Sequence, residues 1–77
     1  ITNPNKRGTG VWVESTNPII RNNIFTSNKR DGIFVTGTGD PKIESNIFRE
    51  NDANGISVAR AAKGEIRGNL FVNTGFG

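Results

Sequence analysis

The 77-residue sequence contains no cysteine and no histidine, and these two absences exclude several kinds of chemistry. Without them there is no disulfide, no zinc site of the usual Cys/His type, and no histidine-dependent triad or acid–base catalyst. Long apolar runs are also missing, since apolar residues make up 32% of the chain and the mean hydropathy is −0.48. We therefore expect no metal site, no cofactor and no membrane partner.

Methionine is absent too, so Ile1 is not a natural translation start, and we expect a processed piece or a domain of a longer protein. Residues 1–77 form one small module, whose core is marginal without oligomerisation or a continuing chain. The charge is mildly basic, with ten lysines and arginines against seven aspartates and glutamates. Without a recognisable reading element, that excess does not favour nucleic acid as a partner.

What the sequence does contain is a repeat of 23 residues. Ile20, Ile43 and Ile66 show this spacing, which divides the chain into an irregular first rung, 1–16, and repeats at 17–39, 40–62 and 63–77. The other rows are Asn23, Asn46 and Asn69; Phe25, Phe48 and Phe71; Asn28, Asn51 and, one residue early, Asn73; and Gly10, Gly32, Gly55 and Gly77. Repeats of this length are typical of solenoids.

Each repeat has the pattern of short strands broken by asparagine and glycine, as in Gly32 followed by Ile33-Phe34-Val35. A unit of this length cannot bury its own apolar face, so successive units must stack. The pattern predicts an all-β fold, a right-handed parallel β-helix of about three rungs of 22–23 residues. Equivalent residues then lie about 4.8 Å apart. Isoleucine and phenylalanine rows become interior ladders, and asparagine rows become amide ladders at inner corners. The glycines fill a corner that needs positive φ or has no room for a Cβ.

The chain resembles the parallel β-helix repeats of the carbohydrate-binding and sugar-hydrolase group, which includes polysaccharide lyases and epimerases. The segments 10–23, GVWVESTNPIIRNN, and 46–56, NIFRENDANGI, are similar to the repeat in the β-helix substrate-binding domain of F-box ubiquitin-ligase subunits. The resemblance covers about residues 10–77 and implies the β-helix fold. It also implies that the module recognises a protein for ubiquitination or contacts a polysaccharide.

The acidic residues do not assemble into a catalytic pair when the rungs are aligned. Shifted by 23 residues, Glu44 falls between Arg21 and Arg67, and Glu65 meets Lys42. A retaining glycosidase needs two carboxyl groups about 5–5.5 Å apart, so only diagonal positions or neighbouring strands could supply such a pair. We therefore expect no catalytic residue and interpret the pattern as opposite-charge ladders between rungs.

Candidate binding residues lie at outward positions that the core does not need. Trp12 and Phe34 follow the glycine corner in successive rungs, and aromatic side chains anchor protein interfaces and stack on sugars. Two basic pairs, 6–7 and 29–30, precede the same corner and suit an acidic ligand or peptide. The alternatives are cover by a loop for the aromatics and a solvated turn for the basic pairs. The predicted partner-binding residues are Trp12, Phe34, Arg7, Lys29 and Arg30.

A second outward apolar row, Ile24, Ile47 and Leu70, predicts an interface with another chain or with a missing part of the parent protein. Three functions are compatible with these patterns. The favoured one is a binding module for a protein partner. The others are a fragment of a carbohydrate-active β-helix that acts on or binds an acidic glycan, and a structural solenoid that self-assembles end to end. A homo-oligomer or a longer parent chain is expected in each case.

Overall fold

Nine short strands make up the computed structural model, which describes residues 1–3, 5 and 8–74. The strands are β1 (Val11–Glu14), β2 (Ile19–Arg21), β3 (Ile24–Thr26), β4 (Asp31–Thr36), β5 (Lys42–Glu44), β6 (Ile47–Arg49), β7 (Asn54–Val58), β8 (Glu65–Arg67) and β9 (Leu70–Val72). No described segment forms a helix long and apolar enough to cross a membrane.

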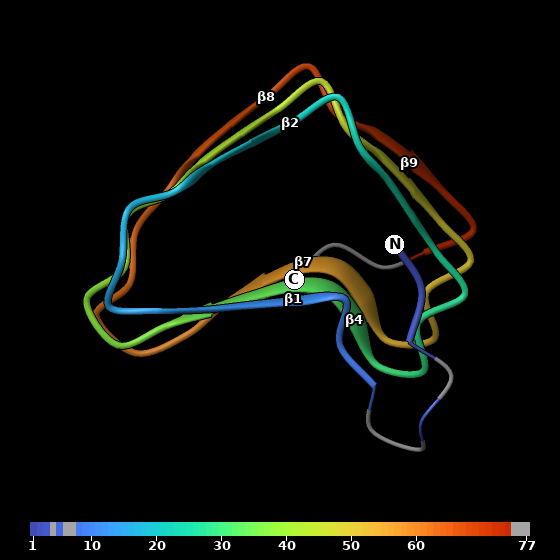
Figure 1. The fold of residues 1–77 in the computed structure, drawn as a ribbon, viewed down its shortest axis with the longest axis horizontal. Helices are drawn as coiled ribbons and strands as arrows, with labels where there is room; N and C mark the ends of the chain where they lie inside the picture. Colours follow the sequence, from blue (N-terminus) through green and yellow to red (C-terminus); the bar gives the residue numbers. More distant parts are fainter. Residues whose placement is uncertain (4, 6–7, 75–77) are drawn as a thin grey trace.

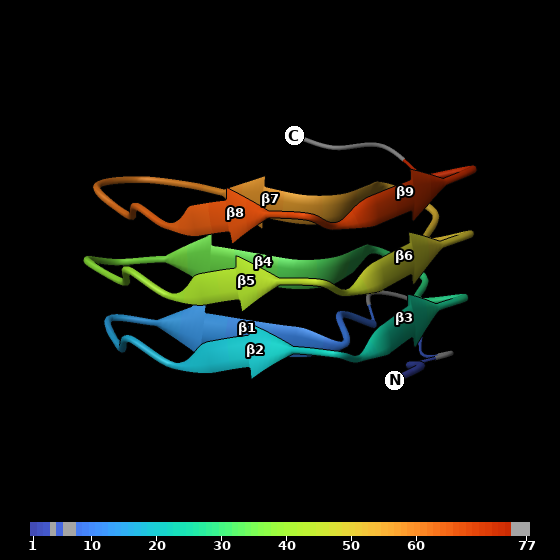
Figure 2. The ribbon, with the colours of Figure 1, turned by 90° about the horizontal axis from the view of Figure 1, so that it is seen from above.

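Three successive strands form one coil, and the coils stack in register. The sheets have the orders β1-β4-β7, β2-β5-β8 and β3-β6-β9, and every pairing is parallel. Viewed along the stack, the coils superpose with one sheet on each of three sides (Figure 1), and a perpendicular view shows three layers (Figure 2). The predicted all-β solenoid of about three rungs is confirmed.

The interior contains the rows that the repeat predicts, except that Ile66 of the last rung is 45% exposed. Register places Ile20, Ile43 and Ile66 above one another, and likewise Phe25, Phe48 and Phe71. The phenylalanine rings stack almost parallel, with centroids 4.9 and 5.0 Å apart and interplanar angles of 8° and 10°. The buried apolar core consists of Val13, Phe25, Ile33, Val35, Ile43, Phe48 and Ile56.

Asparagine amides connect the rungs at one inner corner, as predicted. Asn46 is 1% exposed, and its Oδ1 accepts the backbone N–H of Asn23 at 2.9 Å. Its Nδ2 donates to Oδ1 of Asn69 at 3.1 Å and to the carbonyl of Ile20 at 2.9 Å. These bonds satisfy polar groups that would otherwise be costly to bury.

The second asparagine row follows the prediction for two rungs and departs from it in the third. Asn28 donates from Nδ2 to Oδ1 of Asn51 at 2.7 Å. Above them, the hydroxyl of Thr74 donates to the carbonyl of Asn51 at 3.2 Å, so Thr74 occupies the third position. Asn73 instead takes the left-handed corner that precedes it, with φ of 48°. The placement of Asn73 in this row was wrong because the rungs keep their corner geometry, and the corner residue cannot also occupy the ladder position.

Left-handed backbone marks the corner after each strand. The rows are Ser15, Gly37 and Arg60; Asn22, Ser45 and Gly68; and Ser27, Glu50 and Asn73, with φ between 48° and 71°. Glycine and short polar residues are the commonest in this conformation. The corner geometry therefore repeats even where the residue type changes.

The recurring glycines are required by lack of space for a Cβ and not by a positive φ. Gly10, Gly32 and Gly55 lie outside the set of positive-φ residues. A Cβ built on Gly32 would lie 2.7 Å from the carbonyl oxygen of Gly55 and 2.8 Å from Cδ1 of Phe48. Of the two reasons expected for this row, the close approach of neighbouring rungs is the operative one. Gly77 lies outside the described residues.

Candidate functional site

The outer surface of β1 and β4 carries an aromatic pair. Strand alternation turns the flanking valines and isoleucine inward and places Trp12 and Phe34 on the outside. The two residues are register partners, their ring centroids are 4.6 Å apart, and the rings are tilted by 42°. Trp12 is 54% exposed and Phe34 is half-buried. Ser57 takes the same position in β7, so the aromatic row covers two rungs.

Arg30 closes one end of this aromatic pair. Its Cζ lies 5.5 Å from the centroid of the Phe34 ring, which is a cation–π distance. Its backbone is held by the carbonyl of Gly8 at 2.9 Å and by the N–H of Ala53 at 2.8 Å. Its Nε lies 3.7 Å from Oδ2 of Asp31, a carboxylate that is 2% exposed. The guanidinium is therefore positioned by a ring and a buried anion.

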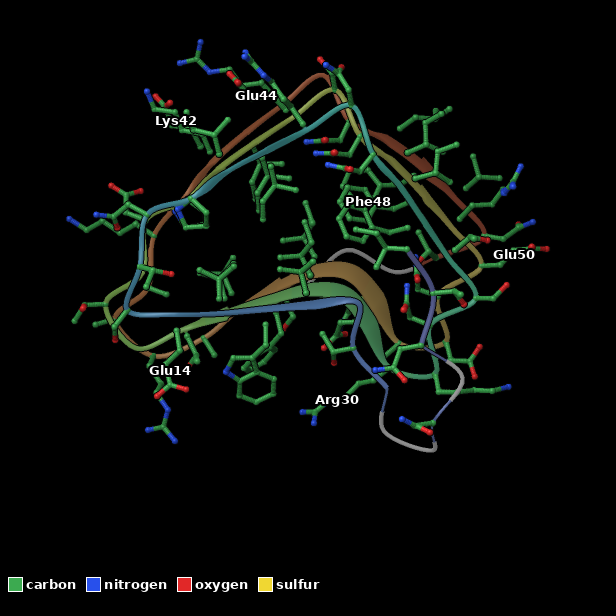
Figure 3. The ribbon with its side chains drawn as sticks, in the orientation of Figure 1. Glu14, Arg30, Lys42, Glu44, Phe48 and Glu50 are labelled. Carbon is green, nitrogen blue, oxygen red and sulfur yellow. The ribbon has the colours of Figure 1, made fainter. Side chains whose placement is uncertain are left out.

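Glu14 closes the opposite end. Two residues after Trp12 on the same strand, its Oε1 accepts a hydrogen bond from Nε1 of the indole at 3.2 Å. Figure 3 shows Glu14 and Arg30 on the same outer side of the coil, well apart from each other, while Phe48 lies inside. Together, Trp12, Phe34, Arg30 and Glu14 are called the aromatic face below. Sequence reasoning missed Glu14, although its i, i+2 spacing from Trp12 places both on one side of a strand.

A family model for the right-handed β-helix region matches residues 1–77. The chain belongs to the right-handed β-helix family. Searches among curated proteins and among solved structures returned no match. The family match concerns the fold and names no substrate, partner or reaction, so the function of this β-helix has to be argued from its surface.

The structure brings only some of the predicted binding residues of this β-helix together. Trp12, Phe34 and Arg30 form one cluster. Lys29 is exposed in the turn beside Arg30, and its backbone N–H donates to the carbonyl of Asn3 at 3.2 Å. Arg7 lies outside the described residues.

The second apolar row occupies a different face of the β-helix, the outside of β3-β6-β9. Ile24, Ile47 and Leu70 are register partners, with Ile24 49% and Leu70 56% exposed and Ile47 half-buried. Val72, at the next outward position of β9, extends the row. The register partner of Val72 in β6 is the exposed Arg49, so one charged side chain borders this apolar row. Its role as an interface stays a prediction.

Charged residues gather on the third face, the outside of β2-β5-β8. The register aligns Glu44 with Arg21 and Arg67, and Lys42 with Glu65, as expected. The expected ion pairs between rungs do not form. Within the described ranges the ion pairs are Arg30–Asp31 and, inside β8, Arg67–Glu65 at 3.2 Å. Long side chains two residues apart on one strand can also reach each other, and an exposed ion pair of either kind stabilises little.

Carboxylates do not gather into a metal-binding group in residues 1–3, 5 and 8–74. The structure shows no cluster of three or more acidic side chains there that could hold a metal ion. In the strand register, Glu14 faces Thr36 and Asp31 faces Asn54, so neither carboxylate stacks on another. On the aromatic face, by contrast, aromatic and charged side chains contact one another.

Proposed function

We propose that this β-helix is a non-catalytic binding module that docks a protein partner on the aromatic face. The observation that carries the proposal is the exposed Trp12 ring, which is held in place on two sides. Phe34 packs against it at 4.6 Å, and Glu14 accepts its indole N–H at 3.2 Å. An aromatic side chain fixed before binding loses little conformational entropy when a partner covers it, which is why such residues dominate interface energetics.

The interior of the β-helix is complete without Trp12. Val13 and Val35, the inward neighbours of the aromatic pair, are 2% and 0% exposed. The core is filled by the interior isoleucines, valines and phenylalanines on the other side of the strands. Trp12 therefore adds apolar area to the surface without a packing role in the core, and tryptophan is among the side chains enriched at protein interfaces.

Charges at the aromatic face favour a polypeptide over an acidic glycan. An anionic polysaccharide would meet Arg30 and Lys29 favourably, but it would also approach the exposed carboxylate of Glu14. A polypeptide can present both signs of charge. In the setting implied by the resemblance to F-box subunits, the partner would be a protein destined for ubiquitination. The acidic glycan is the second candidate, because the open Trp12 ring could stack on a sugar.

The proposal is tested by selecting binders from an unbiased displayed-peptide library on the intact chain. Selected peptides should lose about tenfold or more in affinity for Trp12→Ala, the usual effect of removing an aromatic anchor. Leu70→Ala, which truncates an exposed side chain on another face, should bind them as tightly as the unsubstituted chain does. Selected peptides that ignore Trp12→Ala would overturn the proposal. So would Trp12-dependent binding of polygalacturonate without any enriched peptide, which would favour the glycan.

A further inference from the structure

The two ends of the aromatic face carry opposite charges. Arg30 lies just before β4, and Glu14 ends β1, which runs parallel to β4. The line from the cation to the carboxylate therefore follows the strand direction, as the positions of Arg30 and Glu14 in Figure 3 show. The two aromatic rings lie between them, since the Arg30 guanidinium lies over the Phe34 ring and the Glu14 carboxylate accepts the indole N–H of Trp12. A partner lying along the strands meets a cation, then aromatic surface, then an anion.

Both charges are available to a partner. The Arg30 side chain is 47% exposed, although Asp31 lies 3.7 Å from it, and the exposed Lys29 adds a second cation at the same end. Glu14 is exposed and uses one carboxylate oxygen for the indole, which leaves the other free. Among the described residues, no cation lies within ion-pair distance of Glu14. Arg60, beyond the end of β7 on the third rung, makes no ion pair with it.

The spacing of the three features matches an extended chain. Side chains on one side of an extended peptide recur every two residues, about 7 Å apart. Glu14 follows Trp12 by two residues on one strand, and the Arg30 guanidinium lies 5.5 Å from the Phe34 ring. Three alternate side chains of an extended peptide can therefore reach the cation, the aromatic pair and the carboxylate at once.

From this juxtaposition we infer that the docked segment is an extended peptide with an acidic, an apolar and a basic side chain at alternate positions. The inference rests on the proposed function and specifies its partner. The acidic side chain pairs with Arg30, the apolar one covers Trp12 and Phe34, and the basic one pairs with Glu14. Complementary charges fix the direction of the chain and disfavour segments of uniform charge.

Three capped synthetic peptides test this arrangement. Each has leucine at the centre and threonine at the intervening positions, and the outer positions carry glutamate and lysine, two glutamates, or two lysines. Binding is followed by calorimetry on the full chain. The mixed-charge peptide should bind about fivefold more tightly than either uniform peptide, the upper range for one exposed ion pair.

Charge changes on the β-helix should then change the preference. Glu14→Lys should bind the two-glutamate peptide best, and Arg30→Glu should bind the two-lysine peptide best. Because Arg30→Glu places a second carboxylate beside the buried Asp31, Arg30→Gln serves as a milder variant. It should reduce the discrimination between the mixed and two-lysine peptides, with Lys29 as the remaining cation at that end.

The outcomes distinguish a failure of this inference from a failure of the proposed function. If all three peptides bind equally and Trp12→Ala weakens all of them, the binding face stands and the charge rule is overturned. If the mixed-charge peptide does not bind at millimolar concentration, the charge rule is also overturned, while the library selection decides the proposed function independently. Preferences that follow the substitutions support the inference.

Discussion

Two aromatic rows cross the rungs of this β-helix, one inside the coil and one outside. The interior rings of Phe25, Phe48 and Phe71 are nearly parallel, at 8° and 10°, with centroids 4.9 and 5.0 Å apart. The exterior pair, Trp12 and Phe34, lies at a similar distance, 4.6 Å, but is tilted by 42°. Phe48 is fully buried, whereas more than half of Trp12 is exposed.

The difference shows what holds each row. Inside, neighbouring side chains and the glycine row enclose each phenylalanine ring, so that it can only lie parallel to the rings above and below. The distance between ring centroids is therefore close to the spacing between strands. Outside, no such enclosure exists, and polar partners set the ring positions: Arg30 against Phe34 and Glu14 against Trp12. The interior row is therefore fixed by the packing of the core, and the exterior row is not.

The largest expected effect comes from truncating the middle of the interior row. Phe48→Ala removes a fully buried ring stacked on both sides, and the free energy of unfolding should fall by about 3–5 kcal/mol. Trp12→Ala should change it by less than about 1 kcal/mol, because the side chain is largely exposed. Denaturant unfolding at one fixed protein concentration measures both. Equal losses for the two variants would mean that Trp12 covers the core, and the distinction between the interior and exterior aromatic rows would be wrong.

A smaller loss should follow from adding one methyl group beside the interior row. In Gly32→Ala the new Cβ meets the carbonyl oxygen of Gly55 at 2.7 Å and the Phe48 ring at 2.8 Å, so the rungs must shift. The expected loss is about 3 kcal/mol, the upper range for overpacking. Gly64→Ala is the matched control, since its nearest neighbour would lie 3.5 Å away. Equal unfolding temperatures for the two variants would show that the packing around the interior rings can accommodate an added methyl group.

The smallest of the three effects concerns the corner that precedes the interior phenylalanine. Asn46→Ala removes an amide that bonds to the rungs above and below, leaving the backbone N–H of Asn23 and the carbonyl of Ile20 without these partners. We expect a loss of about 2 kcal/mol for the buried groups left unpaired. The exposed Asn5→Ala should be nearly neutral. A thermal melt that shows no loss for Asn46→Ala would assign the register to aromatic stacking alone.

Much of this fold can be predicted from the repeat. Residues 23 apart can share one environment only if the units stack, so the isoleucine, phenylalanine and first asparagine rows follow from spacing alone. The same alternation predicts that Trp12 and Phe34 point outward. The third position of the second asparagine row could not be predicted this way, because Thr74 replaces asparagine there and Asn73 takes a corner that tolerates several residue types.

The candidate site is less predictable than the fold. Trp12, Phe34 and Arg30 can be chosen from their positions in the repeat, yet nothing in the spacing shows that the Arg30 guanidinium reaches back over the Phe34 ring. The ion pairs show the same limit. The register of Glu44 with Arg21 and Arg67 is correct, but Arg67 pairs with Glu65 on its own strand.

The sequence by itself determined the all-β solenoid, the number of rungs, the strand register and the side of each strand that faces the core. All of these depend on the period and on alternation, which are properties of the chain. Only the tertiary structure decided that the recurring glycines are required by close packing between rungs. It also decided that Glu14 and Arg30 close opposite ends of one aromatic face. Both facts depend on distances across strands and around turns. A difference of a few ångströms decides whether two side chains are in contact there, and no periodicity encodes such distances.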